Sequence, residues 1–300
     1  TNQENPIKKE PVDYQKIPHY KAVVDVERKH VFSVVSAGYH LVKNEEAISL
    51  GKKCFQTVFS QSTETGMQVY NVIMPKTRSF CHIDFLHEEG GFTLYSIDRW
   101  VPFLRVTNSY NRTKPLRFDL GFCRSICKNG VIFNKQSITF RYLHTNDEIA
   151  QTAKFNVSTT DLKNLETQFI ARLHHLKQYH IPPELMFPLL CRVFRIQFTE
   201  DIKEHPKRVE QLLDFQERAR TLTQKYFAEM GPNGYAAFNV MTDFASRPFK
   251  LFISPEAQID TLQKRSGAWI DRFIHEIENP AFELDSYLAD YTKQQHYLRN

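Results

Sequence analysis

The chain has 300 residues, of which 41% are hydrophobic and 13% aromatic, and it carries a formal net charge of +5. The length allows one large domain or two ordinary ones, and the apolar content is sufficient for a packed core, which excludes a globally disordered chain. No apolar run approaches the roughly 18 residues of a transmembrane helix. Five cysteines without regular spacing indicate reduced thiols, and the polar N-terminus lacks a signal-peptide pattern. These features favour a soluble, cytoplasmic protein.

The first half of the chain is predicted to be rich in strands and to contain one clear helix. Residues 1–20 hold three prolines and almost no apolar periodicity, which indicates an extended arm. Asn44 is suited to cap a helix whose apolar stripe runs from Ala47 to Val58. Turns are expected at residues 108–114 and 128–130. β-Branched and aromatic runs predict strands over residues 21–26, 30–35, 39–42, 66–75, 78–87, 91–100, 101–106, 116–120, 131–133 and 137–143.

The second half is predicted to be helical. Apolar residues at spacings of three and four predict helices that begin near residues 159, 183, 206, 235, 255 and 280. We therefore predict an α+β fold, with an antiparallel, sheet-rich N-terminal half that carries one helix, followed by a helical C-terminal half. The expected division is an arm over residues 1–20, a sheet-rich basic core over 21–155, and a helical half over 156–300 that packs on the core.

Positive charge is concentrated between Arg99 and Arg141. This stretch holds nine Lys or Arg residues and a single acid, Asp119, so the rest of the chain is net negative. Eight aromatic residues alternate with these cations: Trp100, Phe103, Tyr110, Phe118, Phe122, Phe133, Phe140 and Tyr142. A basic surface with aromatic rings suits a polyanion whose bases can stack, and this favours nucleic acid, with DNA favoured over RNA. The alternative is a solvated polar sheet face, but such faces usually mix both signs of charge.

The loop over residues 107–114 is the centre of the predicted nucleic-acid surface. It combines amides, hydroxyls, one aromatic ring and two cations, which can bind phosphate, sugar and base edges. We expect the cations to neutralise phosphates, Tyr110 to stack on a base and Asn108 to form hydrogen bonds. The predicted contact residues are Arg105, Asn108, Tyr110, Arg112, Lys114, Arg117, Arg124 and Lys128.

Patterns for catalysis and metal binding are weak. Cys123 and Cys127 lack a second cysteine pair, so packing is the preferred interpretation. Asp84, Glu88 and Glu89 resemble the acids of a metal-dependent nuclease only superficially, and a solvated hairpin turn explains them better. The sequence contains neither the glycine-rich loops of ATPases and dinucleotide enzymes nor a GxSxG nucleophile motif. We predict no catalytic residue, no cofactor and no metal.

Three blocks of the sequence resemble a known family. They are VVSAGYHLVKNEEA (34–47), FLRVTNSYNRTKPLRFDLGFCRSICKNGV (103–131) and YAAFNVMTDFAS (235–246). In order and separation they are similar to the phage- and plasmid-borne family known as domain of unknown function 932, over about residues 20–250. The resemblance implies a protein of a mobile element and supplies no catalytic residues. The order of elements also resembles that of Rad52-type annealing proteins, in which a helix and an antiparallel sheet precede a helix that crosses the sheet.

Three functions of different classes are compatible with these observations. The first is a non-catalytic nucleic-acid-binding protein that prefers single strands and acts in annealing, replication or protection, for which a homo-oligomer would be natural. The second is a protein-interaction component of a phage–host conflict system, whose helical half docks a phage or host protein. The third is a nucleic-acid-processing enzyme with a dispersed site. Salt-sensitive binding of oligonucleotides supports the first, since neutralised phosphates release counterions.

Overall fold

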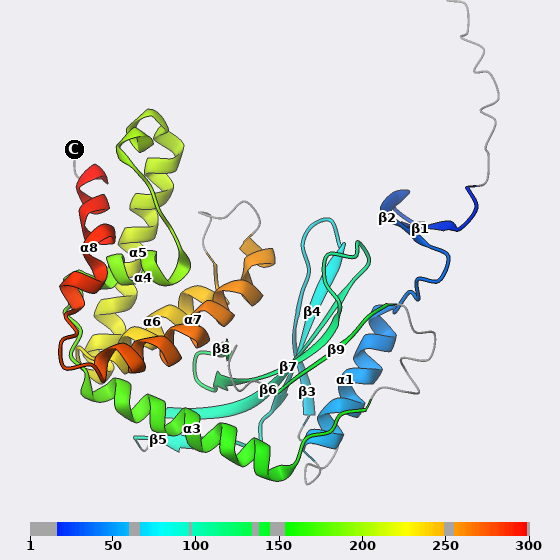
Figure 1. Cartoon of the computed structure of the whole chain (residues 1–300), viewed down its shortest axis with the longest axis horizontal. Coiled ribbons are helices and arrows are strands. Elements are labelled where there is room, and N and C mark those ends of the chain that lie inside the picture. Colours follow the sequence, from blue (N-terminus) through cyan, green and yellow to red (C-terminus); the bar gives the residue numbers. More distant parts are fainter. Residues whose placement is uncertain are drawn as a thin grey trace, which may run out of the picture.

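The computed structural model describes residues 17–59, 67–95, 98–133, 138–144, 154–248 and 255–298. Strands with one helix come first and a group of helices follows, which confirms the predicted α+β class (Figure 1). The strands are β1 (Tyr20–Asp25), β2 (His30–Ser36), β3 (Met67–Ile73), β4 (Phe80–His87), β5 (Phe92–Leu94), β6 (Asp98–Ser109), β7 (Leu116–Arg124), β8 (Asn129–Ile132) and β9 (Thr139–Tyr142). The α-helices are α1 (Asn44–Val58), α3 (Thr159–Gln178), α4 (Met186–Phe194), α5 (Pro206–Met230), α6 (Gly234–Ser246), α7 (Pro255–Ile277) and α8 (Leu284–Gln294). Short 3-10 helices are η2 (Pro183–Leu185), η3 (Glu200–Glu204) and η4 (Gln295–Leu298).

Within the described residues, the strands form two antiparallel sheets. β1 and β2 make a two-stranded hairpin, and the large sheet has seven strands in the order β3-β4-β6-β7-β8, with β5 beside β6 and β9 beside β7. Short turns join β3 to β4 and β6 to β7, and the connection from β4 to β6 contains the short strand β5, so the strand order is that of an antiparallel meander.

The register of the large sheet aligns polar side chains in two rows on one face. Cross-strand partners in an antiparallel sheet point to the same face, and the next residue along each strand points to the other face. The first row consists of Asn71, Asp84, Arg105, Asp119 and Thr139. The second row consists of the polar residues His82, Thr107, Arg117 and Arg141, with the apolar Ile73 of β3 at its edge. We call this side the polar face of the sheet.

Helix α1 covers the opposite, apolar face. Its buried stripe includes Leu50, Cys54 and Phe55, which belong to one hydrophobic cluster with Phe85 and Leu104 of the sheet. The stripe predicted for this helix therefore packs as expected from its spacing.

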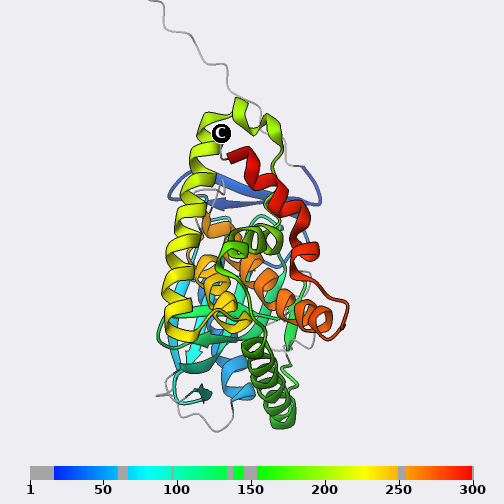
Figure 2. The same cartoon turned by 90° about the vertical axis from the view of Figure 1, so that its left-hand side faces the viewer.

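The helical half shares a second hydrophobic cluster with the sheet. Trp100 of β6 packs against Phe169 of α3, with ring centroids 5.2 Å apart, and stacks on Phe238 of α6 at 6.0 Å. Figure 1 shows α3 running along the sheet toward the other helices. Figure 2 shows α5 as a long helix at one edge of the group of helices. Within the part of the chain that the structure describes, no helix has the length and apolar character needed to cross a membrane.

The predicted cap of α1 is wrong. Lys43 is the N-cap residue and makes no side-chain capping bond, while Asn44 is already helical. The backbone N–H of Asn44 instead donates to the hydroxyl of Tyr110 at 3.0 Å. The side-chain oxygen of Asn44 accepts hydrogen bonds from Asn108 and Cys81, each at 3.1 Å. A tertiary contact thus replaces the local cap.

Two local predictions also differ from the structure. Residues 39–42 form no strand, and Asn129 with Gly130 opens β8, so the turn spans residues 125–128. A side-chain hydrogen bond explains the second difference, because the backbone N–H of Gly130 donates to Ser246 of α6 at 3.1 Å. Packing against the helical half therefore overrides the turn preference of the Asn-Gly pair.

Candidate functional site

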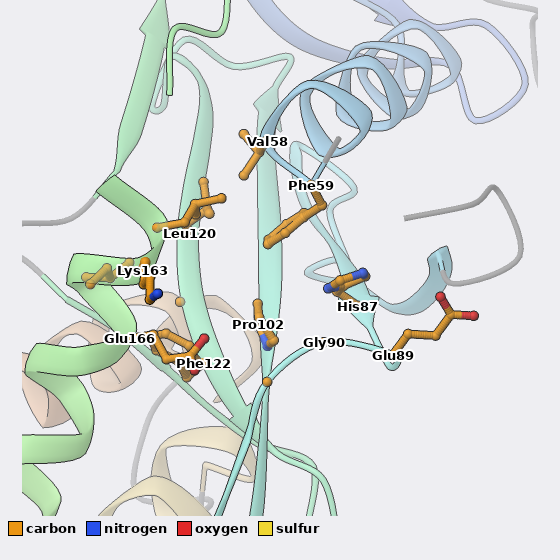
Figure 3. A pocket seen from close by; sticks show the side chains of 14 residues that line it. Val58, Phe59, His87, Glu89, Gly90, Pro102, Leu120, Phe122, Lys163 and Glu166 are labelled. Carbon is orange, nitrogen blue, oxygen red and sulfur yellow. The ribbon is translucent and has the colours of Figure 1, made fainter. Parts of the chain in front are cut away.

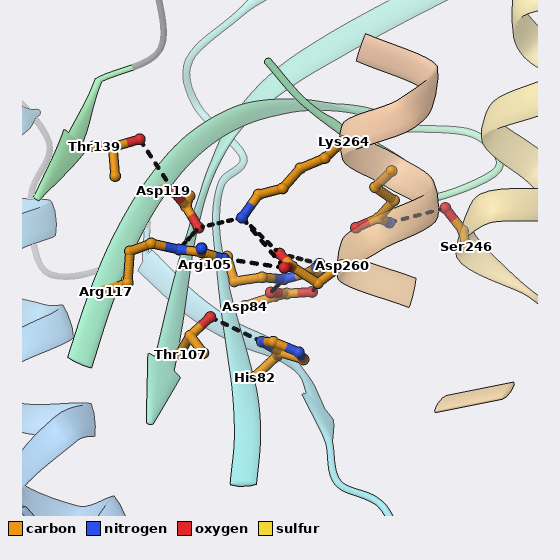
Figure 4. Close-up of polar contacts among 11 residues, drawn as sticks. His82, Asp84, Arg105, Thr107, Arg117, Asp119, Thr139, Ser246, Asp260 and Lys264 are labelled. Atoms are coloured by element: carbon orange, nitrogen blue, oxygen red, sulfur yellow. Dashed lines mark hydrogen bonds and ion pairs between the residues drawn. The ribbon is translucent and has the colours of Figure 1, made fainter. Parts of the chain in front are cut away.

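A network of charged side chains lies between the polar face of the sheet and helix α7 (Figure 4). Arg105 of β6 binds both carboxylate oxygens of Asp84 of β4, with Nε–Oδ1 and Nη2–Oδ2 distances of 2.7 Å. The Nη1 atom of Arg105 lies 3.7 Å from Oδ1 of Asp260 in α7. These three residues are only 1%, 4% and 4% exposed, respectively. Buried charges require such partners, so the network fixes the position of α7 relative to the sheet.

The network continues along the polar face to β7 and β9. Asp119 accepts hydrogen bonds from Nε of Arg117 at 2.6 Å, from Lys264 at 3.2 Å and from Thr139 at 3.1 Å. Nη2 of Arg117 also donates to Asp260 at 3.0 Å. The three carboxylates of the network face three cations, so its formal charges balance.

Burial and neighbouring charges set the protonation states in this region. Burial opposes ionisation of Asp260, but Arg105, Lys264 and Arg117 hold the pKa of its carboxyl well below the ordinary value. Burial, assisted by Arg105, lowers the pKa of His82 well below that of a free imidazole. The neutral ring is held through Nδ1, which lies 2.8 Å from the hydroxyl of Thr107.

These positions correct one prediction about the acids. Asp84 does not lie in a solvated hairpin turn but in β4, where it is 4% exposed and paired with Arg105. Glu88 and Glu89 are exposed after β4, as expected. In the described ranges, no three His, Cys, Asp or Glu side chains are grouped so that they could hold a metal ion.

The exposed end of the polar face, together with two turns, is positively charged. We call it the basic sheet end. The β3–β4 and β6–β7 turns lie side by side, since the backbone N–H of Tyr110 donates to the carbonyl of Ser79 at 2.8 Å. Neither turn, residues 74–79 or 110–115, contains an acid. The cations of the basic sheet end are Lys76, Arg78, Arg112, Lys114, Arg117 and Arg141.

Two of these cations occupy unfavourable backbone conformations. Arg78 has φ 54° and Arg112 has φ 62°, the left-handed region that glycine adopts without steric cost. The ammonium of Lys114 lies 5.1 Å from the ring centroid of Phe80, and burial lowers the pKa of Lys114. The basic sheet end thus combines strained arginines with a cation over a half-buried aromatic ring.

The structure brings together three of the predicted contact cations at this end, Arg112, Lys114 and Arg117, and Tyr110 lies in the same turn. Arg105, Asn108 and Arg124 are 1%, 0% and 4% exposed, so they do not lie on the exposed surface that the sequence predicted. Arg105 belongs to the charged network, Asn108 donates to the carbonyl of Val42 at 2.9 Å, and Arg124 pairs with Asp98 at 2.5 Å. Burial demands internal partners for these polar groups, which explains their positions.

Tyr110 belongs to the β6–β7 turn, whereas Lys128 lies outside the basic sheet end. The ring of Tyr110 packs against Phe32 of the β1–β2 hairpin at 5.4 Å, and burial raises the pKa of its hydroxyl to about 12. Lys128 is exposed in the β7–β8 turn, near the end of β7 opposite to Arg117, with its ammonium 4.9 Å from the ring centroid of Tyr70.

Sequence reasoning missed Lys76 and Arg78 because they precede the basic stretch. The turn between the strands predicted over residues 66–75 and 78–87 was the available signal, since neighbouring hairpins of a meander place alternate turns at the same end of a sheet. A count of charges along the chain could not show that the β3–β4 and β6–β7 turns are neighbours.

A family model described as Domain of unknown function (DUF932) matches residues 31–266. The chain belongs to the DUF932 family. This confirms the resemblance found in the sequence, and the matched segment runs from β2 into α7, so it contains the whole charged network from Asp84 to Lys264. No curated protein and no solved structure matches this DUF932 chain. The likeness to Rad52-type proteins therefore stays a prediction.

Proposed function

We propose that this DUF932 protein binds nucleic acid without catalysis, prefers single strands, and uses the basic sheet end as its contact surface. In this role it would serve annealing, replication or protection of the nucleic acid of a phage, plasmid or other mobile element. The observation that carries the proposal is the pair of adjacent turns in which Arg78 and Arg112 both adopt left-handed backbone conformations.

The argument rests on the cost of those conformations. A non-glycine residue in the left-handed region is disfavoured by about 1 kcal/mol or more, and two such arginines in adjacent turns support a use for their combined charge. Lys76 and Lys114 add positive charge in the same two turns, and Arg141 follows on the polar face beside Arg117, whose own charge is balanced by Asp119 and Asp260. Such clustered cations bind phosphates and release counterions. Phe80, half buried beneath Lys114, offers a ring against which an unpaired base can stack, which supports a preference for single strands.

Replacing both strained arginines tests the proposal without straining the backbone. Arg78→Gly combined with Arg112→Gly removes two cations while glycine relieves the left-handed conformation, so the fold should be kept. We expect the affinity for a labelled single-stranded oligonucleotide to fall about tenfold at low salt, and the slope of log K against log salt to flatten by about 1.4 to 1.8. Fluorescence anisotropy at several salt concentrations, with single-stranded and duplex probes, measures both.

Arg195→Gly is the matched control. Arg195 is also an exposed arginine with a left-handed backbone, φ 57°, but it ends α4 in the helical half. Compared with Arg112→Gly alone, it should leave binding unchanged. Equal losses in the two single variants, or no binding by the wild type at low salt, would exclude the basic sheet end as the contact surface.

The β1–β2 hairpin favours the second candidate, a protein-interaction component of a phage–host conflict system. Val24 pairs with Val31 and Ala22 pairs with Val34, so these side chains share one face of the hairpin. Val24, Val31 and Val34 are 47%, 55% and 58% exposed. A contiguous exposed apolar strip is typical of a protein contact. Failure of all oligonucleotide binding would direct attention to this hairpin.

A further inference from the structure

A recess in the helical half lies where the end of α4 meets α7 and α8. Its volume is ≈ 360 Å³, within the range of about 300 to 1,000 Å³ that is typical of small-molecule sites. Figure 1 shows α4 and α8 at the opposite end of the molecule from the β1–β2 hairpin. The side chains that line the recess belong neither to the charged network nor to the basic sheet end.

The charged side chains of the recess are mostly arginines. Arg192 and Arg195 lie at the end of α4, and Arg272 lies on α7. Glu276 is the only carboxylate among the lining residues that the structure describes. Within the described ranges, no ion pair joins any of the three arginines to a carboxylate. The recess therefore carries uncompensated positive charge, whereas the formal charges of the charged network balance.

A fourth arginine adds to this excess of positive charge. Arg265 lies two turns before Arg272 on α7, and its Nη1 donates to the carbonyl of Phe194 at the end of α4. Burial lowers the pKa of Arg265, and the neighbouring charge of Arg195 lowers it further. Like charges held close together repel each other, so a bound anion would reduce an electrostatic cost that the fold carries at this place.

The main chain at the end of α4 does not oppose an anion. The last carbonyl oxygens of a helix carry partial negative charge when they lack donors. Here the carbonyl of Phe194 accepts from Arg265, and the carbonyl of Arg192 accepts from the backbone N–H of Arg195 at 3.3 Å. Internal donors thus occupy these oxygens, and the arginine side chains set the charge of the recess.

Arg192 is held in place by aromatic rings. Its guanidinium carbon lies 3.8 Å from the ring centroid of Tyr287 and 6.0 Å from that of Tyr291, both on α8. The hydroxyl of Tyr291 accepts a hydrogen bond from Nε2 of Gln197 at 3.3 Å. A guanidinium stacked on a ring keeps its N–H donors at its edge, where they match the oxygens of a phosphate. Arg192 is half buried, and Arg195 and Arg272 are exposed, so a ligand can reach all three.

The cavity on the apolar face of the sheet shows the opposite balance of charge (Figure 3). Its volume is ≈ 420 Å³, and it lies between the end of α1 and the first turns of α3. Its charged lining residues are Lys163, Glu89 and Glu166. Two carboxylates beside one cation disfavour an anion. Of these two cavities, the recess in the helical half is the one suited to negative charge.

We infer that the recess between α4, α7 and α8 binds a small phosphate-bearing ligand with at least two negative charges. Arg192, Arg195 and Arg272 donate N–H groups to its phosphate oxygens. Three cations against one carboxylate favour a dianion over a monoanion, so an oligonucleotide without a terminal phosphate should not compete for this site. The segment matched by the family model ends at residue 266, before Arg272 and the tyrosines of α8, so the site extends beyond the matched segment.

Isothermal titration calorimetry of the full chain with pyrophosphate, at constant ionic strength, tests the inference. We expect a submillimolar Kd for the wild type. Arg192→Gln and Arg272→Gln should each weaken binding by about fivefold or more, because each removes a charge-assisted hydrogen bond. Glu276→Gln should have the opposite effect and tighten binding by about twofold, because it removes the carboxylate of the recess.

Inorganic phosphates and nucleotides share this chemistry, and titration with ADP separates them. ADP that binds at least tenfold more tightly than pyrophosphate would identify a nucleotide, whose base adds contacts to the aromatic wall. Equal affinities would identify the phosphate groups as the whole recognised part. Either result supports the recess as an anion site.

Lys163→Gln, which removes the exposed cation of the cavity on the apolar face, is the matched control and should bind pyrophosphate as the wild type does. The Arg78→Gly, Arg112→Gly double variant should also bind it normally, so failure of the proposed nucleic-acid function would leave this result unaffected. Loss of pyrophosphate binding in either control would move the site elsewhere and overturn the inference.

The inference is also overturned if the wild type binds no pyrophosphate at millimolar concentration. The same holds if Arg192→Gln and Arg272→Gln, shown by circular dichroism to be folded, bind as tightly as the wild type. Weaker binding by Glu276→Gln would contradict the expected sign of the effect and count against the site in the same way.

Discussion

The guanidinium of Arg105 lies at the centre of the charged network, between Asp84 and Asp260. The residue stands in the most basic part of the chain, yet it is 1% exposed and its guanidinium is held by Asp84 and Asp260. A buried ion pair of this kind contributes little net stability compared with apolar packing, but the loss of one partner leaves an uncompensated charge. The network therefore specifies how β4, β6 and α7 fit together.

Arg105→Gln should destabilise the protein by about 3 to 5 kcal/mol, because Asp84 and Asp260 would stay buried without their main cation. Acid unfolding should also move to higher pH. The folded-state pKa of Asp260 is depressed, so the stability it contributes is present above its unfolded value and is lost as pH falls through the folded value. Without Arg105 the folded-state pKa of Asp260 rises, so the loss of stability begins at a higher pH. Urea unfolding at pH 7 and a pH titration followed by circular dichroism measure the two effects.

Arg220→Gln provides the comparison for this prediction. Arg220 pairs with Glu217 at 2.7 Å on the surface of α5, where both side chains are largely exposed. Because solvent screens this ion pair, its removal should barely change the free energy of unfolding. An equal effect of the two substitutions would show that the buried network does not hold α7 on the sheet.

At the scale of elements, the close approach of α1 to the sheet depends on Gly51. A Cβ at this position would lie 2.7 Å from the ring of Phe85 and 2.8 Å from a methyl group of Val106. Alanine is otherwise the better helix former, so helix propensity and packing act in opposite directions here. Close packing against the sheet therefore requires glycine at this position, although alanine would be better for the helix alone.

Gly51→Ala should therefore destabilise the protein by about 1 to 3 kcal/mol through overpacking, despite the improved helix propensity. Gly38→Ala is the control, since nothing lies within 4 Å of a Cβ at Gly38. Thermal unfolding of both variants decides the matter. A stabilised Gly51→Ala protein would mean that α1 can move away from the sheet without cost.

The types of most elements were predictable from periodicity, because alternation and helical spacing record which side of each element is buried. The stripe from Leu50 to Val58 and the strand run around Ile83 are examples. The candidate site was harder to predict from the sequence. Arg105, Asp119 and Asp260 meet through strand register and through a helix 141 residues beyond Asp119, and neither is encoded in local patterns. A linear charge count also could not separate the exposed Arg112 from the buried Arg124.

At the scale of the whole molecule, one hydrophobic cluster contains residues of the sheet and of the helices. Trp100 of β6 and Trp269 of α7, the two tryptophans of the chain, both belong to it. The indole N–H of Trp100 donates to the hydroxyl of Tyr235 at 3.0 Å, and that tyrosine also bonds to Asp98. Neither half can lose its packing without exposing apolar surface of the other.

We therefore expect one cooperative unfolding transition in urea. Tryptophan fluorescence, which reports on the shared cluster, and far-UV circular dichroism, which reports on all helices and strands, should give the same midpoint. Trp269→Phe leaves Trp100 as a reporter of the sheet, and its fluorescence midpoint should still equal the midpoint from circular dichroism of that variant. Separate midpoints would indicate two independently stable halves.

The pairing of Trp100 with Tyr235 also has a consequence for synthesis on the ribosome. The two residues are 135 positions apart, so the nascent sheet emerges well before α6, which covers one face of the Trp100 indole, is translated. At elongation rates of roughly 5 to 20 residues per second, the wait is on the order of ten seconds. During that interval the nascent chain exposes hydrophobic surface of the sheet, and that surface is buried only when the late helices of the same chain arrive.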